Sequence, residues 1–316
     1  MKIYTDIKNF KPISYPVVTI GTFDGVHIGH QKIFTRLKEV AQKNKGETLV
    51  ITFNPHPRLV LEPNNTELKF INTQKKKFEL LEEAGIDHLI VLPFTKDFAT
   101  ISSRNFIKSF LVDELKAKKI IVGYDHHFGR ERRGSFKVLR GLAKIYDFEV
   151  EEIPAQDIKN IAVSSTKIRD ALFKGDVKKA NILLGYEYSI TGIVVRGSQI
   201  GRKLGFPTAN IDLDDHYKLI AANGVYACKV EWNNNFYKGM GNIGVRPTIN
   251  ENGLTIEVNI FDFYQDIYDE IITIYFIDRF RDEKKFKNLD FLRRRLTIDK
   301  HRTLQIFKEY EKKAKG

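Results

Sequence analysis

Two histidines stand three residues apart in the stretch His27-Ile28-Gly29-His30, which follows an apolar segment and a glycine-bearing loop. At the start of a helix, side chains at positions i and i+3 face one side, beside unpaired backbone N–H groups and the positive end of the helix dipole. Imidazoles in this setting suit a polyphosphate whose charge grows in the transition state. An ordinary pair of surface histidines is the alternative if these residues are taken alone.

Other known phosphate and metal motifs do not fit the histidine stretch. A Walker loop needs Lys-Ser or Lys-Thr after its glycines, and a dinucleotide fingerprint needs the spacing G-x-G-x-x-G. A zinc site needs a third ligand, and none follows at a convincing spacing.

The elements expected around this stretch bring three more histidines to it. Strands alternate with helical patterns and predict a mostly parallel sheet with crossover helices, in which ligands bind beyond the carboxyl ends of the strands. His56, His126 and His127 each follow a predicted strand and are expected at the same crevice. The predicted strands are residues 17–20, 48–53, 88–92, 119–123 and 148–153, and the first helix is residues 29–44.

A run of hydroxyls at the start of a later helical pattern adds a candidate phosphate clamp. Ser164, Ser165 and Thr166 precede Arg169 by up to one and a half turns. Hydroxyls at this position often only cap the helix. The added arginine makes phosphate binding a second interpretation.

The C-terminal half carries a different constellation. Residues 192–211 combine glycines with basic side chains, and Thr208 and Asn210 stand two apart on an extended chain, so that both point the same way. Two such oxygen ligands suit a hard cation, although a flexible hairpin would also be rich in glycine. In the predicted strand 254–263 the even positions are apolar, which places Glu257 and Asn259 together on the other face. Glu257 is a solvent-facing carboxylate or, if that face lines a pocket, a general base.

The pattern of the chain changes after about residue 185. Short alternating runs separated by glycine or asparagine predict an antiparallel barrel or sandwich, followed by a C-terminal helix. We therefore expect one domain at residues 1–184 and a second at residues 185–316. The predicted strands of the second are residues 188–196, 224–232, 236–242, 254–263 and 270–278.

The formal charge of +12 raises the question of nucleic acid. Most of the excess lies in residues 279–316, which hold 14 Lys/Arg against 6 Asp/Glu. A solvated helix face explains this run, and no nucleic-acid motif accompanies it, so we expect no nucleic-acid partner. The single Cys228, the absence of a signal-peptide pattern and the lack of an apolar stretch of about 20 residues predict a cytoplasmic protein without a membrane partner. Oligomeric state is not decided by sequence, and a transient homo-oligomer stays open.

Residues 21–30, 53–57, 123–129 and 164–169 together resemble the FMN adenylyltransferase module of bacterial bifunctional riboflavin kinase/FAD synthetases. The resemblance implies a doubly wound, Rossmann-like nucleotidyltransferase domain. It implies that the FMN phosphate attacks the α-phosphate of ATP, with His27 and His30 stabilising phosphate charge. It implies flavin contacts for Asn54 and Asp125. The residues implied in ATP or phosphate binding are Gly21, Phe23, Gly29, Ser164, Ser165, Thr166 and Arg169.

Residues 201–211, 241–248, 256–258, 262–263 and 279–281 resemble the riboflavin kinase module, a small antiparallel β-barrel. This implies that Thr208 and Asn210 position Mg²⁺ with ATP and that Glu257 activates the 5′-hydroxyl of riboflavin. Gly201, Lys203 and Gly205 are implied in ATP binding, and Arg279 and Arg281 in flavin binding. Riboflavin, FMN and FAD would be the substrates and products of the two domains.

Three positions depart from the pattern of the family. His126 stands where many relatives carry an aromatic residue, Asn259 where histidine is common, and Asp269 where glycine is common. These departures concern loop and flavin contacts. Two rival hypotheses remain: a kinase whose transferase half is altered, and a basic nucleic-acid-binding protein that keeps an enzyme-like shell.

Overall fold

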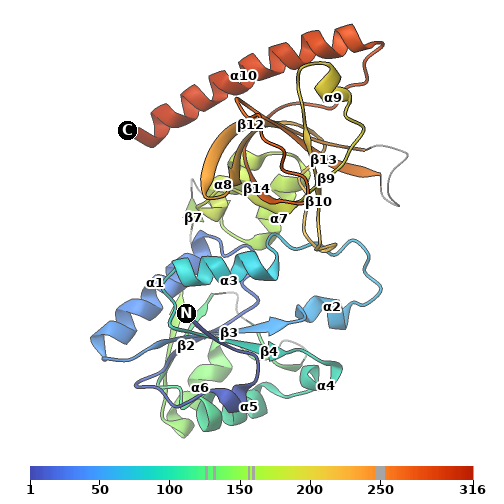
Figure 1. Ribbon diagram of the computed structural model, residues 1–316. Coiled ribbons are helices and arrows are strands. Elements are labelled where there is room, and N and C mark those ends of the chain that lie inside the picture. Colours follow the sequence, from blue (N-terminus) through green and yellow to red (C-terminus); the bar gives the residue numbers. More distant parts are fainter. Residues whose placement is uncertain (125–126, 131–132, 156, 159–160, 246–252, 316) are drawn as a thin grey trace. The chain divides into compact units, whose positions relative to one another are not determined.

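The computed structural model describes residues 1–124, 127–130, 133–155, 157–158, 161–245 and 253–315, which form two compact units (Figure 1). The units are Met1–Ser165 and Thr166–Gly316. Helices α7 (Ser165–Phe173) and α8 (Val177–Leu184) therefore fall almost entirely in the second unit. Asn181 of α8 donates its amide to the carbonyl of Phe276 in the barrel at 2.8 Å. The functional boundary after residue 184 stays a prediction.

The first unit is built on a six-stranded sheet whose strands are all parallel, in the order β1-β4-β3-β2-β5-β6. The prediction of a doubly wound sheet is confirmed. Successive strands run outward from β2 in one direction through β3, and in the other through β5, so the order reverses between β2 and β5. The strands are β1 (Lys2–Tyr4), β2 (Val17–Ile20), β3 (Thr48–Asn54), β4 (His88–Pro93), β5 (Lys119–Gly123) and β6 (Glu149–Ile153).

Helices cover the sheet because its strands are apolar on both faces. Val18 and Ile20 of β2 belong to a core with Phe106 and Leu139, whereas α1 packs against β2, β3 and β5. The described helices between the strands are η1 (Ile7–Asn9), α1 (Ile28–Lys43), α2 (Pro57–Leu61), α3 (Gln74–Glu83), α4 (Lys96–Ala99), α5 (Ser103–Phe106), η2 (Ile107–Glu114) and α6 (Phe136–Tyr146). After β6, the short strands β7 (Asp157–Ile158) and β8 (Ile161–Ala162) pair as a separate antiparallel sheet.

The second unit is a closed antiparallel barrel in the order β10-β13-β12-β11-β14-β9. This confirms the predicted barrel. Its core includes Cys228, whose burial raises the pKa of the thiol, so the sulfur stays protonated and is no nucleophile. The elements are β9 (Ser189–Val195), α9 (Ile200–Lys203), β10 (Ala209–Asp212), β11 (Gly224–Trp232), β12 (Asn235–Val245), β13 (Leu254–Ile260) and β14 (Ile271–Arg281).

Residues with left-handed backbone angles determine one hairpin turn and one strand end of the barrel. Asn233 and Asn234 adopt left-handed backbone angles, φ 49° and 60°, which close a two-residue hairpin between β11 and β12. Asp262 has φ 55°, and β13 ends at Ile260 rather than at the predicted residue 263, because left-handed backbone cannot continue a strand.

The long helix α10 (Leu289–Lys315) lies along the barrel (Figure 1). It packs there through Ile306 and Phe307, which are buried with Ala227 and Ile277. A buried carboxylate also joins the helix to the barrel. Asp299 accepts hydrogen bonds from Arg281 at 2.6 and 3.0 Å and forms an ion pair with Arg295 at 3.0 Å, and only 1% of its side chain is exposed. None of the described helices combines the length and apolar character needed to cross a membrane.

Substitution of Asp299 by alanine is expected to destabilise the second unit by about 3–5 kcal/mol, because Arg281 would be left buried without its counter-charge. Urea unfolding followed by the fluorescence of Trp232, the single tryptophan of the chain, reports this unit directly. The control is Glu311→Gln, which removes the half-exposed ion pair with Lys238 and should cost less than about 1 kcal/mol. Equal losses in the two variants would contradict the account.

Candidate active sites

The histidine loop lies at the carboxyl end of β2, beside the point where the strand order reverses. His27 caps α1, and its Nδ1 accepts a hydrogen bond from the backbone N–H of His30 at 3.4 Å. The two rings stack with centroids 3.6 Å apart and an interplanar angle of 16°. A Cβ on Gly29 would lie 3.2 Å from the ring of His27, so glycine leaves room for this stack. The structure thus brings both predicted imidazoles to the start of one helix.

The backbone of the loop is strained. Phe23 and Val26 are non-glycine residues with φ of 49° and 39°, and Gly25 has φ 86°. Such left-handed angles cost free energy in residues with a Cβ and are often found where a backbone is held for binding. The carboxylate of Asp24 fixes the turn by accepting from the backbone N–H groups of Ile71 at 2.9 Å and Asn72 at 3.3 Å.

The side chain of Phe23 is buried, although the residue was predicted in phosphate binding. Its ring meets those of His30 and Phe34, each at 5.2 Å. A Cβ on Gly21 would lie 2.9 Å from the same ring. Only the backbone of Phe23 can therefore face a ligand, and its side chain supports His30 from behind.

Burial sets the charge of His30. Desolvation, with a smaller contribution from His27, lowers the pKa of His30 well below its usual value. Its Nδ1 is buried and has no hydrogen-bond partner in the part of the chain that the structure describes. His30 is thus neutral in the free protein at neutral pH. An anionic phosphate arriving beside it would favour the charged form.

The predicted hydroxyls divide between the two units. Ser165 donates its hydroxyl to the carbonyl of Asp24 at 2.8 Å, which ties it to the histidine loop. Ser164 is half-buried in the same unit. Thr166, which is exposed, and Arg169, which is half-buried, lie further along α7 in the second unit.

Asn54 is exposed at the end of β3, at the same edge of the sheet as the histidine loop. Three aromatic rings lie next to it: Phe53 contacts Phe94 with centroids 5.6 Å apart and Phe98 at 5.9 Å. Sequence analysis did not single out these rings. Asp125 and His126, two further predictions for this edge, lie outside the described residues.

In the barrel, Thr208 and Glu257 are brought together. Thr208 donates its hydroxyl to Oε2 of Glu257 at 3.2 Å, and Asn210 is paired with Glu257 across β10 and β13. A Cβ on Gly197 would lie 2.2 Å from Nδ2 of Asn210, so only glycine permits this approach. Because the Thr208 proton points at the carboxylate, its lone pairs face elsewhere and can meet a cation. No cluster of three or more His, Cys, Asp or Glu side chains suited to a metal occurs in the described ranges.

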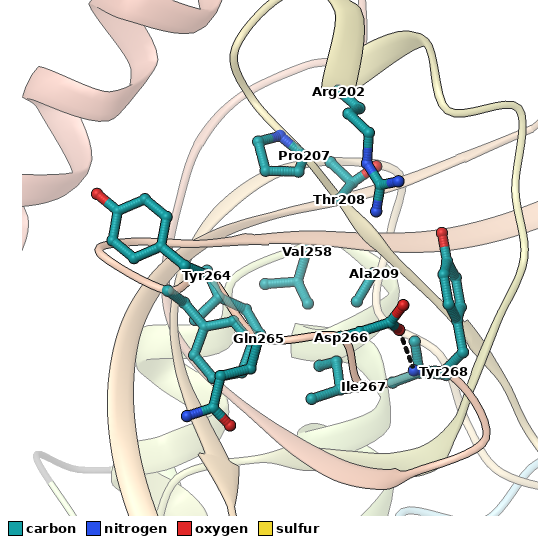
Figure 2. A pocket seen from close by; sticks show the side chains of 13 residues that line it. Arg202, Pro207, Thr208, Ala209, Val258, Tyr264, Gln265, Asp266, Ile267 and Tyr268 are labelled. Carbon is teal, nitrogen blue, oxygen red and sulfur yellow. Dashed lines mark hydrogen bonds between the residues drawn. The ribbon is translucent and has the colours of Figure 1, made fainter.

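A cavity of about 310 Å³ lies beside Thr208. Figure 2 shows Ala209 and Val258 between Tyr264 on one side and Tyr268 on the other, with Arg202 and Thr208 together at one edge. Tyr264 is 95% exposed, which is unusual for an aromatic side chain. The cavity therefore combines an apolar floor, two aromatic walls and a polar edge.

The remaining residues predicted for the barrel site differ in their surroundings. A Cβ on Gly201 would lie 2.3 Å from the carbonyl of Phe206, whereas Gly205, with φ 83°, and the side chain of Lys203 are exposed. Asn259, at the variable position, donates to the carbonyl of Pro207 at 2.6 Å and so braces the segment before Thr208.

Arg279 and Arg281, predicted to bind flavin, both make protein contacts. Arg279 donates to the carbonyl of Asn223 at 2.6 and 3.0 Å and pairs with Asp282 at 2.7 Å. Arg281 forms the buried pair with Asp299 described above. Their part in flavin binding stays a prediction.

Comparison with known proteins follows the same division of the chain. The family model for FAD synthetase matches residues 11–167 and that for riboflavin kinase matches residues 184–307. The bifunctional riboflavin kinase/FMN adenylyltransferase of Buchnera aphidicola (subsp. Acyrthosiphon pisum) is 38% identical over 95% of this chain and 96% of its own length. This chain belongs to the bifunctional riboflavin kinase/FMN adenylyltransferase family. The resemblance inferred from the motifs is confirmed.

Two further proteins are similar to this family member over nearly its whole length. The Bacillus subtilis bifunctional enzyme is 38% identical over 94% of each chain. A crystal structure described as a macrolide-efflux protein from Streptococcus pneumoniae is 35% identical, with a TM-score of 0.88 over 95% of this chain and 97% of that one. The similarity to these two proteins therefore covers both units of this chain.

Sequence reasoning missed one charged residue at the histidine loop. Lys77 of α3 directs its ammonium at the loop, within 3.3 Å of the carbonyl of Thr22. The available signal was its spacing, because Lys77 precedes the buried Leu80 and Leu81 by three and four residues and must share their helix face.

The first unit is expected to lose stability as the pH falls below about 6.5, the ordinary value for histidine. The folded pKa of His30 lies below the unfolded one, so the unfolded state takes up a proton first, at a slope of up to about 1.4 kcal/mol per pH unit. The unfolding transition of the first unit is recognised because it leaves the fluorescence of Trp232, which lies in the second unit, unchanged. Calorimetry at pH 7.5 and 5.5 should show that the stability of this transition decreases less for His30→Gln than for the natural chain. Identical slopes would contradict the assignment.

Proposed function

We propose that this chain carries out two successive ATP-dependent reactions in separate sites. In the barrel, the 5′-hydroxyl of riboflavin attacks the γ-phosphate of ATP, which yields FMN and ADP. In the first unit, the phosphate of FMN attacks the α-phosphate of ATP, which yields FAD and pyrophosphate. The observation that carries this proposal is that relatives named for both activities match the chain over nearly its full length.

In the kinase site, Glu257 accepts the proton that leaves the riboflavin hydroxyl. Its contact with Thr208 fixes the carboxylate, and the pairing with Asn210 places a third oxygen-bearing side chain beside it. Thr208 and Asn210 would hold Mg²⁺, which neutralises phosphate charge when it is bound with ATP. Positioning of the hydroxyl against the phosphate supplies much of the rate.

The cavity beside Thr208 is proposed to bind the adenine of ATP. An adenine ring has apolar faces, which suit Ala209 and Val258, and its phosphates would then extend toward Thr208 and Arg202 (Figure 2). The exposed ring of Tyr264 can close over the base at small conformational cost, because an aromatic side chain has only two rotatable bonds.

In the transferase site, the imidazoles of His27 and His30 and the backbone N–H groups at the start of α1 stabilise the charge that develops on the phosphates. We assign the hydroxyls of Ser164, Ser165 and Thr166 and the guanidinium of Arg169 to the triphosphate. Asn54 with the rings of Phe53, Phe94 and Phe98 offers an amide and an aromatic surface for the flavin. A flavin contact of Asp125 stays a prediction.

We place the enzyme in the cytoplasm, where ATP and riboflavin meet, with small molecules as its partners. Ion pairs give α10 a structural role on the barrel: Arg295 pairs with the buried Asp299 of the same helix, and Glu311 pairs with Lys238 of the barrel. We keep a solvated face as the interpretation of the other basic residues of this helix. Whether copies of the chain associate transiently is left to measurement.

Substitution of Glu257 by alanine is expected to lower FMN formation by about 10²–10⁴-fold, since the general base is lost, and to spare FAD formation from supplied FMN. His30→Ala should lower FAD formation by about 10²-fold and spare FMN formation. Chromatographic separation of riboflavin, FMN and FAD after incubation with ATP and Mg²⁺ measures both. A carboxylate control on the barrel is Glu231→Gln.

A variant that loses both activities while remaining folded would argue against two separate sites. FMN formation without FAD formation by the natural chain would favour a kinase whose transferase half is altered. Neither product, together with salt-sensitive binding of RNA or DNA, would favour the nucleic-acid hypothesis.

A further inference from the structure

Lys77 lies on the buried face of α3, in the first unit. Thr73 caps this helix by accepting from the backbone N–H of Lys76 at 3.2 Å, and Leu80 and Leu81 bury its inner face. Lys77 is in the first turn of the same face, so its side chain extends toward the sheet rather than into solvent. This places a cation where an apolar residue would ordinarily pack.

The ammonium reaches the backbone of the histidine loop. Its Nζ donates to the carbonyl of Thr22 at 3.3 Å and to Oγ1 of Thr52 at 3.2 Å. Thr22 is the second residue of the loop after β2, and Thr52 is a fully buried residue of β3. The ammonium thus bridges the carboxyl ends of two adjacent strands at the edge where the site lies.

Both of these acceptors are neutral, which makes the position costly for a cation. Burial lowers the pKa of Lys77 to about 8, against a smaller opposing effect of the Asp24 carboxylate. Ile71 and Asn72 donate their backbone N–H groups to that carboxylate. A cation held at such cost close to a phosphate site is more often functional than a stabilising element.

We propose that Lys77 is a positioning residue of the adenylyltransferase, and that its ammonium holds the Thr22 carbonyl so that the following turn presents its N–H groups and both imidazoles to the phosphates. This inference rests on the proposed function. The carbonyl of Thr22, turned toward Lys77, is kept from facing the anionic substrate. The left-handed residues Phe23 and Val26 that follow are then held in their strained conformation.

The charged groups around Lys77 allow the role to be isolated. Asp24, His27 and His30 face the same loop, and carboxylates and imidazoles ordinarily titrate below pH 7. On α3 itself, Lys76 is paired with Glu79 at 3.3 Å on the outer side. Loss of activity near pH 8 that depends on residue 77 therefore reports the Lys77 ammonium.

The test uses the full-length chain with Lys77→Met, Lys77→Arg and the neighbouring control Lys76→Met. FAD formation from FMN and ATP is measured as kcat and KM, and riboflavin phosphorylation by the same preparations controls for folding and concentration. Lys77→Met is expected to lower kcat of FAD formation about 100-fold, with KM changed less than about threefold, because misplacement of the loop affects the transition state most. Lys77→Arg should restore kcat to within about tenfold, and Lys76→Met should match the natural chain.

A pH profile separates positioning by charge from simple packing. FAD formation by the natural chain should decline above about pH 8 as the ammonium loses its proton. In Lys77→Arg the decline should move to higher pH, because a guanidinium stays charged. This comparison decides the matter even if Lys77→Met unfolds the first unit.

Two results would overturn the inference. One is FAD formation by Lys77→Met within threefold of the natural chain. The other is a decline near pH 8 in Lys77→Arg that matches the natural chain. If the natural chain itself makes no FAD, the proposed function fails instead, so the two failures are distinguishable.

Discussion

Close approach at a glycine is the physical constraint on which both sites depend. In the first unit, Gly29 leaves room for the ring of His27 to stack on His30, and in the barrel Gly197 leaves room for the amide of Asn210. A Cβ at Gly197 would overlap the amide of Asn210 at 2.2 Å, and a Cβ at Gly29 would make a tight contact of 3.2 Å with the ring of His27. In each candidate site a polar side chain therefore occupies space that a Cβ would fill in any residue other than glycine.

Burying a charged side chain costs free energy, and the two units offset this cost in different ways. In the barrel the buried Arg281 is satisfied by the carboxylate of Asp299, and that pair attaches α10. At the histidine loop, burial keeps His30 neutral, and Lys77 is held by neutral oxygens. The barrel thus contains a completed ion pair, whereas the histidine loop is a site where bound phosphate would supply negative charge.

The two units assemble their proposed phosphate sites in different ways. A parallel sheet brings several loops to one edge at its reversal point, so that short motifs far apart in the chain can share one ligand. An antiparallel barrel instead places Asn210 and Glu257 on adjacent strands, with Thr208 just before the first of them, and register decides which side chains meet. A slip of one residue between β10 and β13 would separate Asn210 from Glu257.

Much of this could be predicted from the sequence by itself. Apolar runs and alternating patterns located ten strands to within a few residues, because periodicity is a local property of the sequence, but they did not predict the short strands β1, β7, β8 and β10. The two activities were inferred from the resemblance of the motifs to a known family. Only the tertiary structure decided which groups meet. The burial that turns Phe23 inward, places Lys77 under the loop and pairs Arg281 with Asp299 depends on contacts between segments far apart in the chain. The spacing of residues in the sequence does not predict such contacts, because they depend on how the helices and strands pack together.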